Sequence, residues 1–367
     1  MKIVIDARKM RTSTGRYARE LLTELEKIDS EDDYIIIGHS EDFKGAHSWT
    51  PTSKNFSSYV LDTPHYTLRE QWTLWRTLRD LKPDLVHFWM PQQPLLYRGK
   101  KVSTVHDLNY IHLRIYNRGV LHYEFKRLIF KVFLRIISRR NDALIAPTNY
   151  TAKDLIDYTG VDPQKVFVTH EGTAGQVNPE KTKPVKKLVG KKYLMYVGQS
   201  SKYKGQLKII KTLQRLRIIH KDLRLAIIGK PNEYTDKLKR IVKEHSYSGV
   251  DFLGFVSDEE LSWAYSNAAA FVQASTSEGF GLMNLEAMVC GCPVVSSNAT
   301  CLPEICGDAA HYFDPNNADE MYAAIDEVLS NEALRKRLVA NGKKQVKNYS
   351  WSKMAKETKS VYDRILG

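Results

Sequence analysis

The sequence is short of cysteine and has no long apolar run. Only four of its 367 residues are cysteines, and all four lie between Cys290 and Cys306. Their C-x-C-x8-C-x4-C spacing differs from the paired C-x2-C spacing of common zinc modules, so we expect buried side chains around a strand at 293–296 rather than a zinc site. No apolar stretch approaches the ~18 residues that span a bilayer. Met1 leads directly into a first strand without a signal peptide, and a cytoplasmic protein is expected.

Acidic residues are outnumbered by basic ones. The chain has 55 Lys and Arg against 42 Asp and Glu, which gives a net charge of +13. Such a charge predicts an anionic partner: nucleic acid, an anionic membrane surface or a phosphorylated substrate. No cluster of arginines and aromatics typical of nucleic-acid binding is present, so nucleic acid is not expected. The segment 6–15 after the first strand also lacks G-x-G-x-x-G, which argues against a nicotinamide-dependent oxidoreductase.

Strand and helix patterns alternate along the whole chain. This alternation predicts parallel sheets that are covered by helices on both faces. A lysine- and proline-rich stretch near the middle suggests a linker, and the length suggests two domains. We expect two Rossmann-like α/β domains that face each other across an interdomain cleft, which would hold the active site. The expected parts are an N-terminal domain at 1–175, a linker at 176–190, a second domain at 191–349 and a C-terminal helix at 350–367 that packs back on the first domain.

The most informative stretch is 277–288, S-E-G-F-G-L-M-N-L-E-A-M. It begins as a loop with two glycines and becomes a helix, directly after an apolar strand. The first amides of such a helix can bind an anion or a sugar hydroxyl. Glu278 and Glu286 bracket these amides and could face one ligand. The alternative is an ordinary strand-to-helix turn with two surface glutamates.

A second informative stretch, 196–205, reads Y-V-G-Q-S-S-K-Y-K-G. A strand that ends at Gly198 and is followed by Lys202 and Lys204 predicts a cationic loop suited to a diphosphate leaving group. Solvated surface lysines are the alternative, since this is the more common location of lysine.

Together these motifs resemble the donor-binding signature of the retaining GT-B glycosyltransferases of family four. In that family the first Glu and the following loop amides contact the transferred sugar, and the second Glu holds the ribose. The family also has a Gly and a Lys at the positions of Gly198 and Lys204, although its usual Arg is Gln199 here, which makes Lys202 the candidate replacement. Two further matches lie in the first half of the chain, at Gly15 before a helix and at His106 after a strand.

The resemblance implies a set of site residues. The implied catalytic residues are Glu278, His106 and Lys204. The implied donor-binding residues are Gly15, Gly198, Gln199, Lys202, Lys204, Gly279, Phe280, Gly281, Leu282 and Glu286.

The resemblance further implies a retaining hexosyltransferase. The donor would be a nucleotide diphosphate sugar, GDP-mannose first and a UDP-sugar second, because the 5–8, 14–17 and 105–108 segments look most like the mannosyl- and rhamnosyltransferase branch. The acceptor would be a glycan or a lipid-linked saccharide in surface polysaccharide or glycoconjugate synthesis. No D-x-D triplet occurs in the sequence, so no metal and no other cofactor is implied. Two alternatives stay open: a sugar phosphorylase or synthase on the same fold, and a non-catalytic protein that binds an anionic ligand.

A basic amphipathic pattern covers 121–140. Arg127, Lys131 and Arg135 recur every four residues among apolar ones. We expect a helix that faces the core and has a solvated basic face. The alternative is a helix that lies on an anionic membrane surface, which would make the protein peripheral on the inner face of the membrane.

Overall fold

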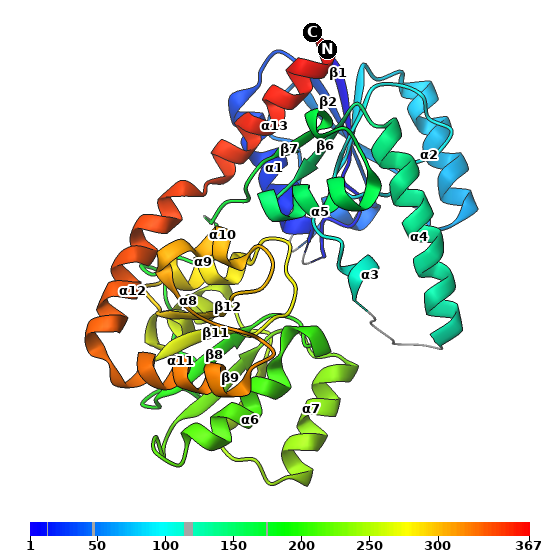
Figure 1. The fold of residues 1–367 in the computed structure, drawn as a ribbon. Coiled ribbons are helices and arrows are strands. Elements are labelled where there is room, and N and C mark those ends of the chain that lie inside the picture. The colour runs from blue at the N-terminus through cyan, green and yellow to red at the C-terminus, as the bar shows by residue number, and fades with distance from the viewer. Residues whose placement is uncertain (13, 46–47, 114–119, 174) are drawn as a thin grey trace. The chain divides into compact units, whose positions relative to one another are not determined.

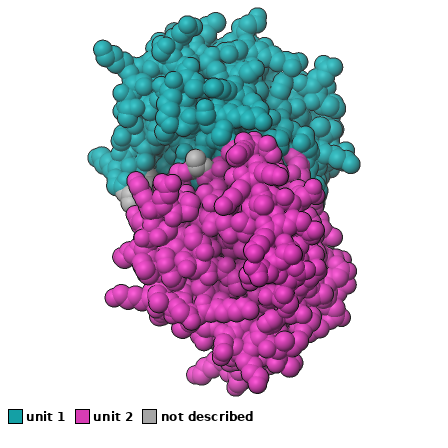
Figure 2. All heavy atoms as spheres, turned by 90° about the vertical axis from the view of Figure 1, so that its left-hand side faces the viewer, with its two compact units in different colours: residues 1–172, 350–367 teal, residues 173–349 magenta. Residues whose placement is uncertain are grey.

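The computed structural model describes residues 1–12, 14–45, 48–113, 120–173 and 175–367. The chain divides into two compact units, which Figure 2 colours separately. Unit 1 comprises Met1–Gly172 and Ser350–Gly367, and unit 2 comprises Thr173–Tyr349. Both units are parallel sheets with helical connections (Figure 1).

Unit 1 is built on a sheet whose strands run in the order β3-β2-β1-β4-β5-β6-β7, all parallel. The strands are β1 (Lys2–Asp6), β2 (Asp33–Gly38), β3 (Phe56–Val60), β4 (Leu85–Phe88), β5 (Lys101–Thr104), β6 (Ala143–Ala146) and β7 (Val166–Val168). The helices are α1 (Gly15–Ile28), α2 (Leu68–Leu81), α3 (Asn109–His112), α4 (Val120–Arg140), α5 (Asn149–Thr159) and α13 (Trp351–Leu366).

The last helix of the chain belongs to unit 1. α13 packs along α1, as Figure 1 shows. Its buried Tyr362 hydroxyl lies 2.6 Å from Nδ1 of His87 on β4. Nε2 of His87 lies 2.9 Å from the Thr104 hydroxyl, so both ring nitrogens of this fully buried histidine have partners. Burial lowers the pKa of His87 to about 3, and the ring is therefore neutral in the folded protein.

Unit 2 is built on a parallel sheet with the strand order β10-β9-β8-β11-β12-β13. The strands are β8 (Tyr193–Val197), β9 (Arg224–Ile228), β10 (Val250–Gly254), β11 (Ala270–Gln273), β12 (Val294–Ser297) and β13 (Ala310–Phe313). The helices are α6 (Gln206–Leu216), α7 (Glu233–Glu244), α8 (Asp258–Asn267), α9 (Leu282–Val289), α10 (Leu302–Cys306), α11 (Ala318–Ser330) and α12 (Glu332–Gln345).

Alternation along β8 explains the two-sided core of unit 2. Tyr193 and Met195 pack with α8 and α9, whereas Leu194 and Tyr196 pack with α6 and α11. All four are at most 1% exposed. A strand buried on both faces needs apolar residues at every position, which is why this one reads as a continuous apolar run.

The lysine-rich segment 176–190 differs from the expected linker. It belongs to unit 2, where Val177, Val185 and Leu188 are buried in the core that also contains α8 and α9. Three apolar side chains among the lysines and prolines are sufficient to hold the segment on the unit. The first segment of unit 1 correspondingly ends at Gly172.

None of the described helices is both long enough and apolar enough to cross a bilayer.

Candidate active site

Two loops of unit 2 meet where the strand order of its sheet reverses. Chain order runs outward in opposite directions from β8 and β11, which are neighbours in the sheet. Open parallel sheets bind their ligands beyond the carboxyl ends of the strands at such a point. The loop 198–205 follows β8 and the loop 274–281 follows β11. The strand order therefore brings together the two motifs of the sequence analysis that lie in unit 2, 196–205 and 277–288.

Lys204 and Glu278 form an ion pair at this point. Nζ of Lys204 lies 3.0 Å from Oε1 of Glu278, and the side chains are only 16% and 13% exposed. Burial acts to lower the pKa of Lys204, but the Glu278 carboxylate outweighs this effect, and the pKa is raised above its ordinary value. Lys204 therefore carries a fixed positive charge at neutral pH.

One oxygen of Glu278 accepts all of its described side-chain hydrogen bonds. Besides Lys204, Nε2 of Gln273 donates to Oε1 at 2.8 Å and the Ser275 hydroxyl donates at 2.7 Å. The Glu278 amide donates to the hydroxyl of Thr300 at 3.0 Å, which fixes the backbone as well. Among the described residues none donates to Oε2. The carboxylate is thus held by one of its two oxygens.

Glycine is required where the two loops approach each other. Gly205 has a φ of 75°, and a Cβ there would lie 2.3 Å from the carbonyl oxygen of Ala274. Gly281, with a φ of 84°, precedes α9, and no described side chain caps that helix. The N-terminal end of α9 at Leu282 consequently opens on the same loop as Glu278, an arrangement that favours an anion or a hydroxyl.

Two predicted donor-binding side chains are buried. Phe280 is 5% exposed and packs edge-on against Tyr349, with ring centroids 5.8 Å apart. Only the backbone at this position is left for a ligand, because the aromatic ring serves the core. Glu286 is 2% exposed, and its Oε2 accepts a hydrogen bond of 3.2 Å from the Tyr265 hydroxyl. A ribose contact by Glu286 remains a prediction.

The loop after β8 presents two exposed side chains, Gln199 and Lys202. Lys202 lies in the 3-10 turn Lys202–Lys204 and makes no ion pair with a described residue, in contrast to Lys204. The two lysines thus differ: Lys204 is paired with a carboxylate, and Lys202 is exposed to solvent.

A pocket of about 180 Å³ lies beside this loop, and we did not anticipate it from the sequence. It is formed at the carboxyl ends of β8, β9 and β10, where Gly198 and Gly229 directly follow β8 and β9 and Gly254 is the last residue of β10. The lining residues are Gly198, Ser200, Ile227, Gly229, Pro231, Thr235, Lys239, Phe252, Leu253 and Gly254. A Cβ at Gly229 would lie 2.3 Å from the carbonyl oxygen of Gly198, so the close approach of these turns depends on glycine. A glycine at the carboxyl end of each of these three strands was the feature of the sequence from which the pocket could have been predicted.

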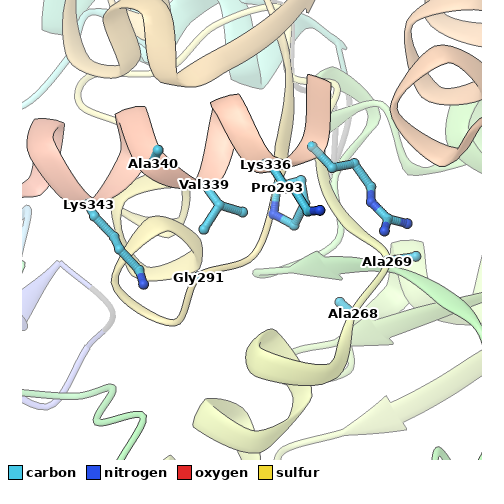
Figure 3. Close-up of a pocket in the computed structure, with 9 residues that line it drawn as sticks. Ala268, Ala269, Gly291, Pro293, Lys336, Val339, Ala340 and Lys343 are labelled. Carbon is cyan, nitrogen blue, oxygen red and sulfur yellow. The ribbon is translucent and has the colours of Figure 1, made fainter. Parts of the chain in front are cut away.

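A larger pocket of about 560 Å³ lies at the opposite edge of the sheet, under α12 (Figure 3). Ala268, Ala269 and Pro293 line it just before β11 and β12 begin. It is therefore at the amino ends of the strands, away from Lys204 and Glu278, and we do not assign the chemistry to it.

His106 lies at the carboxyl edge of the unit 1 sheet, after β5. Its Nε2 lies 3.0 Å from the Trp89 carbonyl oxygen, which can only accept, so this nitrogen carries a proton. Nδ1 lies 3.5 Å from the carboxylate of Glu171, and the ring packs edge-on against Tyr17 at 4.7 Å. All these partners belong to unit 1, so a contact between His106 and the sugar stays a prediction.

Gly15 is the first residue of α1. A Cβ there would lie 2.0 Å from the Met10 carbonyl oxygen, so the close approach of the backbone at this point depends on glycine.

The four cysteines are free thiols and are buried. Burial raises the pKa of each thiol, that of Cys290 to about 12. In the part of the chain that the structure describes, no group of three or more His, Cys, Asp or Glu side chains is arranged to hold a metal ion.

Comparison with known families decides the assignment. The family described as "Glycosyl transferases group 1" matches residues 177–345, and "Glycosyltransferase Family 4" matches residues 14–174. The O-antigen chain mannosyltransferase B of Escherichia coli is 30% identical over 311 residues, which cover 80% of this chain and 77% of that protein. The chain belongs to the group 1 and family 4 glycosyltransferases. The family expected from the sequence is thus confirmed.

One further relative in sequence and one solved structure agree with this assignment. The MMP alpha-(1->4)-mannosyltransferase of Mycolicibacterium hassiacum is 28% identical over 242 residues, 63% of this chain and 56% of that protein. The Anabaena protein HepE, solved with UDP and glucose, superposes with a TM-score of 0.75 at 15% identity and covers 99% of this chain and 100% of its own. Its likeness extends to the architecture, so the expected GT-B fold with two Rossmann-like domains is confirmed.

Proposed function

We propose that this glycosyltransferase moves mannose from GDP-mannose, with retention of anomeric configuration, to a glycan or lipid-linked acceptor in surface polysaccharide synthesis. The observation that carries the proposal is the Lys204–Glu278 pair at the switch point of the unit 2 sheet. The names of the two mannosyltransferase relatives support mannose as the sugar. A UDP-sugar is the second candidate donor, since HepE was solved with UDP and glucose.

In the proposed reaction the bond between the anomeric carbon and the diphosphate oxygen breaks as the acceptor oxygen attacks from the same face. The proton of the acceptor hydroxyl passes to the leaving phosphate oxygen, so no separate general base is needed. Lys204 and the amides at the start of α9 stabilise the negative charge that develops on the diphosphate. Oε2 of Glu278, to which no described residue donates, accepts a hydrogen bond from a sugar hydroxyl. The stabilisation of the diphosphate charge requires no metal.

The proposal includes a membrane surface because of the exposed face of α4. Phe125, Leu128, Ile129 and Val132 are each about half exposed or more, between 49% and 62%. Leu134 and Ile137, nearer the C-terminal end of α4, are buried in the core as expected. Arg127 is only 13% exposed and pairs with Glu124 at 2.8 Å, so the solvent face at 125–132 is mainly apolar with Lys126 exposed on it, which the charge pattern alone did not predict. Such a face suits an anionic membrane, and co-sedimentation with phosphatidylglycerol vesicles that is lost in Ile129→Asp would support it.

The decisive experiment is thermal unfolding of the full chain with GDP, UDP, ADP, TDP or NAD, with and without EDTA. A ligand that binds only the folded state at 100 times its Kd stabilises it by about 2.7 kcal/mol. We expect GDP to raise Tm regardless of EDTA, and Lys204→Ala to reduce the effect. A response that requires a metal would contradict metal independence. No response to any nucleoside diphosphate would overturn the proposed function.

A further inference from the structure

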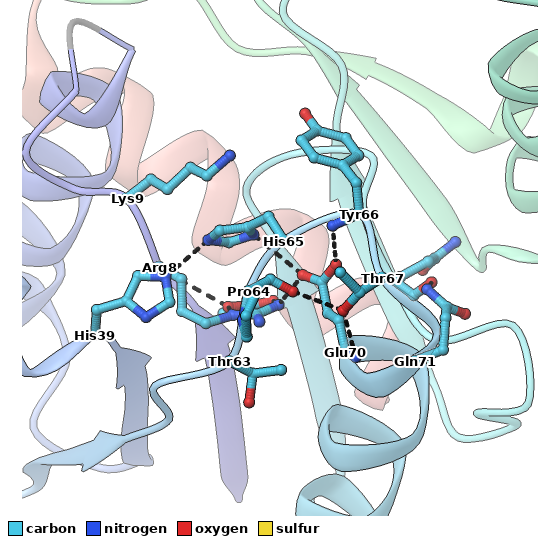
Figure 4. Close-up of polar contacts among 12 residues, drawn as sticks. Arg8, Lys9, His39, Thr63, Pro64, His65, Tyr66, Thr67, Glu70 and Gln71 are labelled. Atoms are coloured by element: carbon cyan, nitrogen blue, oxygen red, sulfur yellow. Dashed lines mark hydrogen bonds and ion pairs between the residues drawn. The ribbon is translucent and has the colours of Figure 1, made fainter. Parts of the chain in front are cut away.

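A buried network of charges lies beneath the loops that follow β1, β2 and β3 in unit 1 (Figure 4). Arg8 donates from Nε and Nη2 to the two oxygens of Asp6, both at 2.7 Å. Its Nη2 also lies 3.0 Å from Oε1 of Glu70 at the start of α2. These three residues are at most 5% exposed. Burial acts to lower the pKa of Arg8, but the two carboxylates outweigh it and raise the pKa, so the pairs stay ionised.

The same network fixes the loop between β3 and α2. Glu70 Oε1 lies 3.1 Å from Nδ1 of His65, and Glu70 Oε2 accepts from the Tyr66 amide at 2.6 Å. Nε2 of His65 in turn lies 2.8 Å from Nε2 of His39, which follows β2. Three loops from three strands are thereby held to one another through side chains that are half-buried or buried.

Two residues on top of this network have strained backbones. Lys9 has a φ of 74° and Tyr66 a φ of 61°, a region that costs a residue with a Cβ about 1–2 kcal/mol. The Lys9 amide donates to Asp42 at 3.0 Å, as the Tyr66 amide does to Glu70, and these bonds offset the strain. Strain that its surroundings maintain in this way is characteristic of binding and catalytic sites.

The strained backbones bring the side chains of Lys9 and Tyr66 together. Nζ of Lys9 lies 4.9 Å from the centre of the Tyr66 ring. Tyr66 is 71% exposed, and Lys9 is half-buried. Figure 4 shows both side chains extending from the network, above His65. Two strained residues thus hold an exposed aromatic ring beside an ammonium group. A ligand that binds to both groups would explain why the protein keeps this strain.

We propose that Lys9 and Tyr66 form a binding site for a neutral sugar ring of the acceptor. The Tyr66 ring packs on the apolar C–H face of a pyranose, and the three N–H donors of Lys9 serve its hydroxyls. The loops that carry both residues follow the carboxyl ends of parallel strands, where such sheets bind ligands. The nearby Arg11 is already paired with Glu41 at 3.3 Å, so Lys9 offers a single charge, which suits a neutral saccharide better than a phosphorylated one. This inference rests on the proposed function and names the acceptor class for it.

The test measures initial rates of the full-length protein at saturating GDP-mannose with mannotriose as the acceptor probe. We expect Tyr66→Ala to raise the KM for mannotriose about tenfold, since a stacking contact of this kind contributes about a factor of ten in affinity. Tyr66→Phe keeps the ring and should stay within about twofold. Lys9→Met should raise the same KM about fivefold, because the hydroxyl contacts are lost. The KM for GDP-mannose and the release of mannose to water should remain unchanged in all three.

Tyr59→Ala is the matched control, because Tyr59 is also an exposed tyrosine of unit 1, 38% exposed on β3. It should leave the KM for mannotriose unchanged. Tyr66→Asn keeps the test valid if Tyr66→Ala unfolds, because asparagine tolerates a left-handed backbone. If the wild type hydrolyses GDP-mannose but does not use mannotriose, or if Tyr66→Asn and Lys9→Met keep the wild-type KM, the inference is overturned while the transferase assignment stands. A wild type that neither binds a nucleoside diphosphate nor cleaves its sugar would instead overturn the proposed function.

Discussion

Replacement of Lys204 by methionine tests the reasoning about the active site most sharply. The substitution removes one partner of an ion pair whose side chains are 16% and 13% exposed. Glu278 would keep two neutral donors, Gln273 and Ser275, so its carboxylate would be only partly compensated. Leaving such a group under-satisfied costs about 1–3 kcal/mol. At about 2–4 °C per kcal/mol for a unit of this size, Tm should fall on the order of 5 °C.

The effect of Lys204→Met on catalysis should be larger than its effect on folding. Loss of a preorganised charge at the diphosphate is expected to reduce kcat/KM by about 10²–10³, or about 2.7–4 kcal/mol. The pKa of Lys204 is raised, so the stabilisation by the pair is fully present below the ordinary lysine pKa and is lost only as pH rises through the higher folded value. The difference in stability between wild type and variant should therefore be constant from pH 7 to pH 9.

The matched variant is Lys202→Met, in the same turn. Lys202 is exposed and has no ion pair among the described residues, so the change in stability should be within about 0.5 kcal/mol. Denaturant unfolding gives the stabilities, and steady-state kinetics with GDP-mannose gives kcat/KM. If Lys204→Met keeps both the stability and the kcat/KM of the wild type, or if Lys202→Met costs as much stability as Lys204→Met, the account of the ion pair is refuted.

Three further predictions follow from buried and close-packed groups. The pKa of His87 is about 3 in the folded protein against an ordinary 6.5, so only the unfolded chain takes up this proton as pH falls below 6.5. At pH 5 this lowers the free energy of unfolding by about 2 kcal/mol, and urea unfolding of His87→Gln should lack this part of the acid dependence. Gly205→Ala should lower stability more than Gly190→Ala, since both have similar positive φ but only a Cβ at Gly205 would lie 2.3 Å from a carbonyl oxygen; equal Tm losses would contradict this. The buried thiols should react slowly with Ellman's reagent in the native protein and all four rapidly in guanidinium, whereas fast native labelling would contradict their raised pKa values.

The sequence was a good guide to the elements that have two buried faces. The apolar runs of β8 and β11 are readable because both faces of each strand are covered, and the glycines beside them mark the turns at the switch point. β3 has no clear apolar pattern in the sequence because it is an edge strand, in which only Phe56 is buried. β7 has no clear pattern because it has three residues, all half-buried.

The candidate site was predictable in its chemistry but not in its contacts. Lys204 and Glu278 are 74 residues apart in the sequence. Their spacing could not show that they form an ion pair with each other and that Lys204 already has a partner before any ligand binds. Phe280 follows a loop glycine in the sequence, yet its ring packs into the core, because an aromatic side chain gains more from burial than from solvent. The Lys9–Tyr66 site depends on left-handed backbone at two ordinary residues, which no sequence pattern marks.

The most direct test of the central claim is to incubate the protein with GDP-α-mannose and mannotriose in EDTA and to record the anomeric proton signals of the product by NMR. The account predicts a new mannoside of α configuration, formed at a rate that Lys204→Met lowers by about 10²–10³. A β-linked product, a reaction that stops in EDTA, or turnover that is indifferent to Lys204 would contradict it.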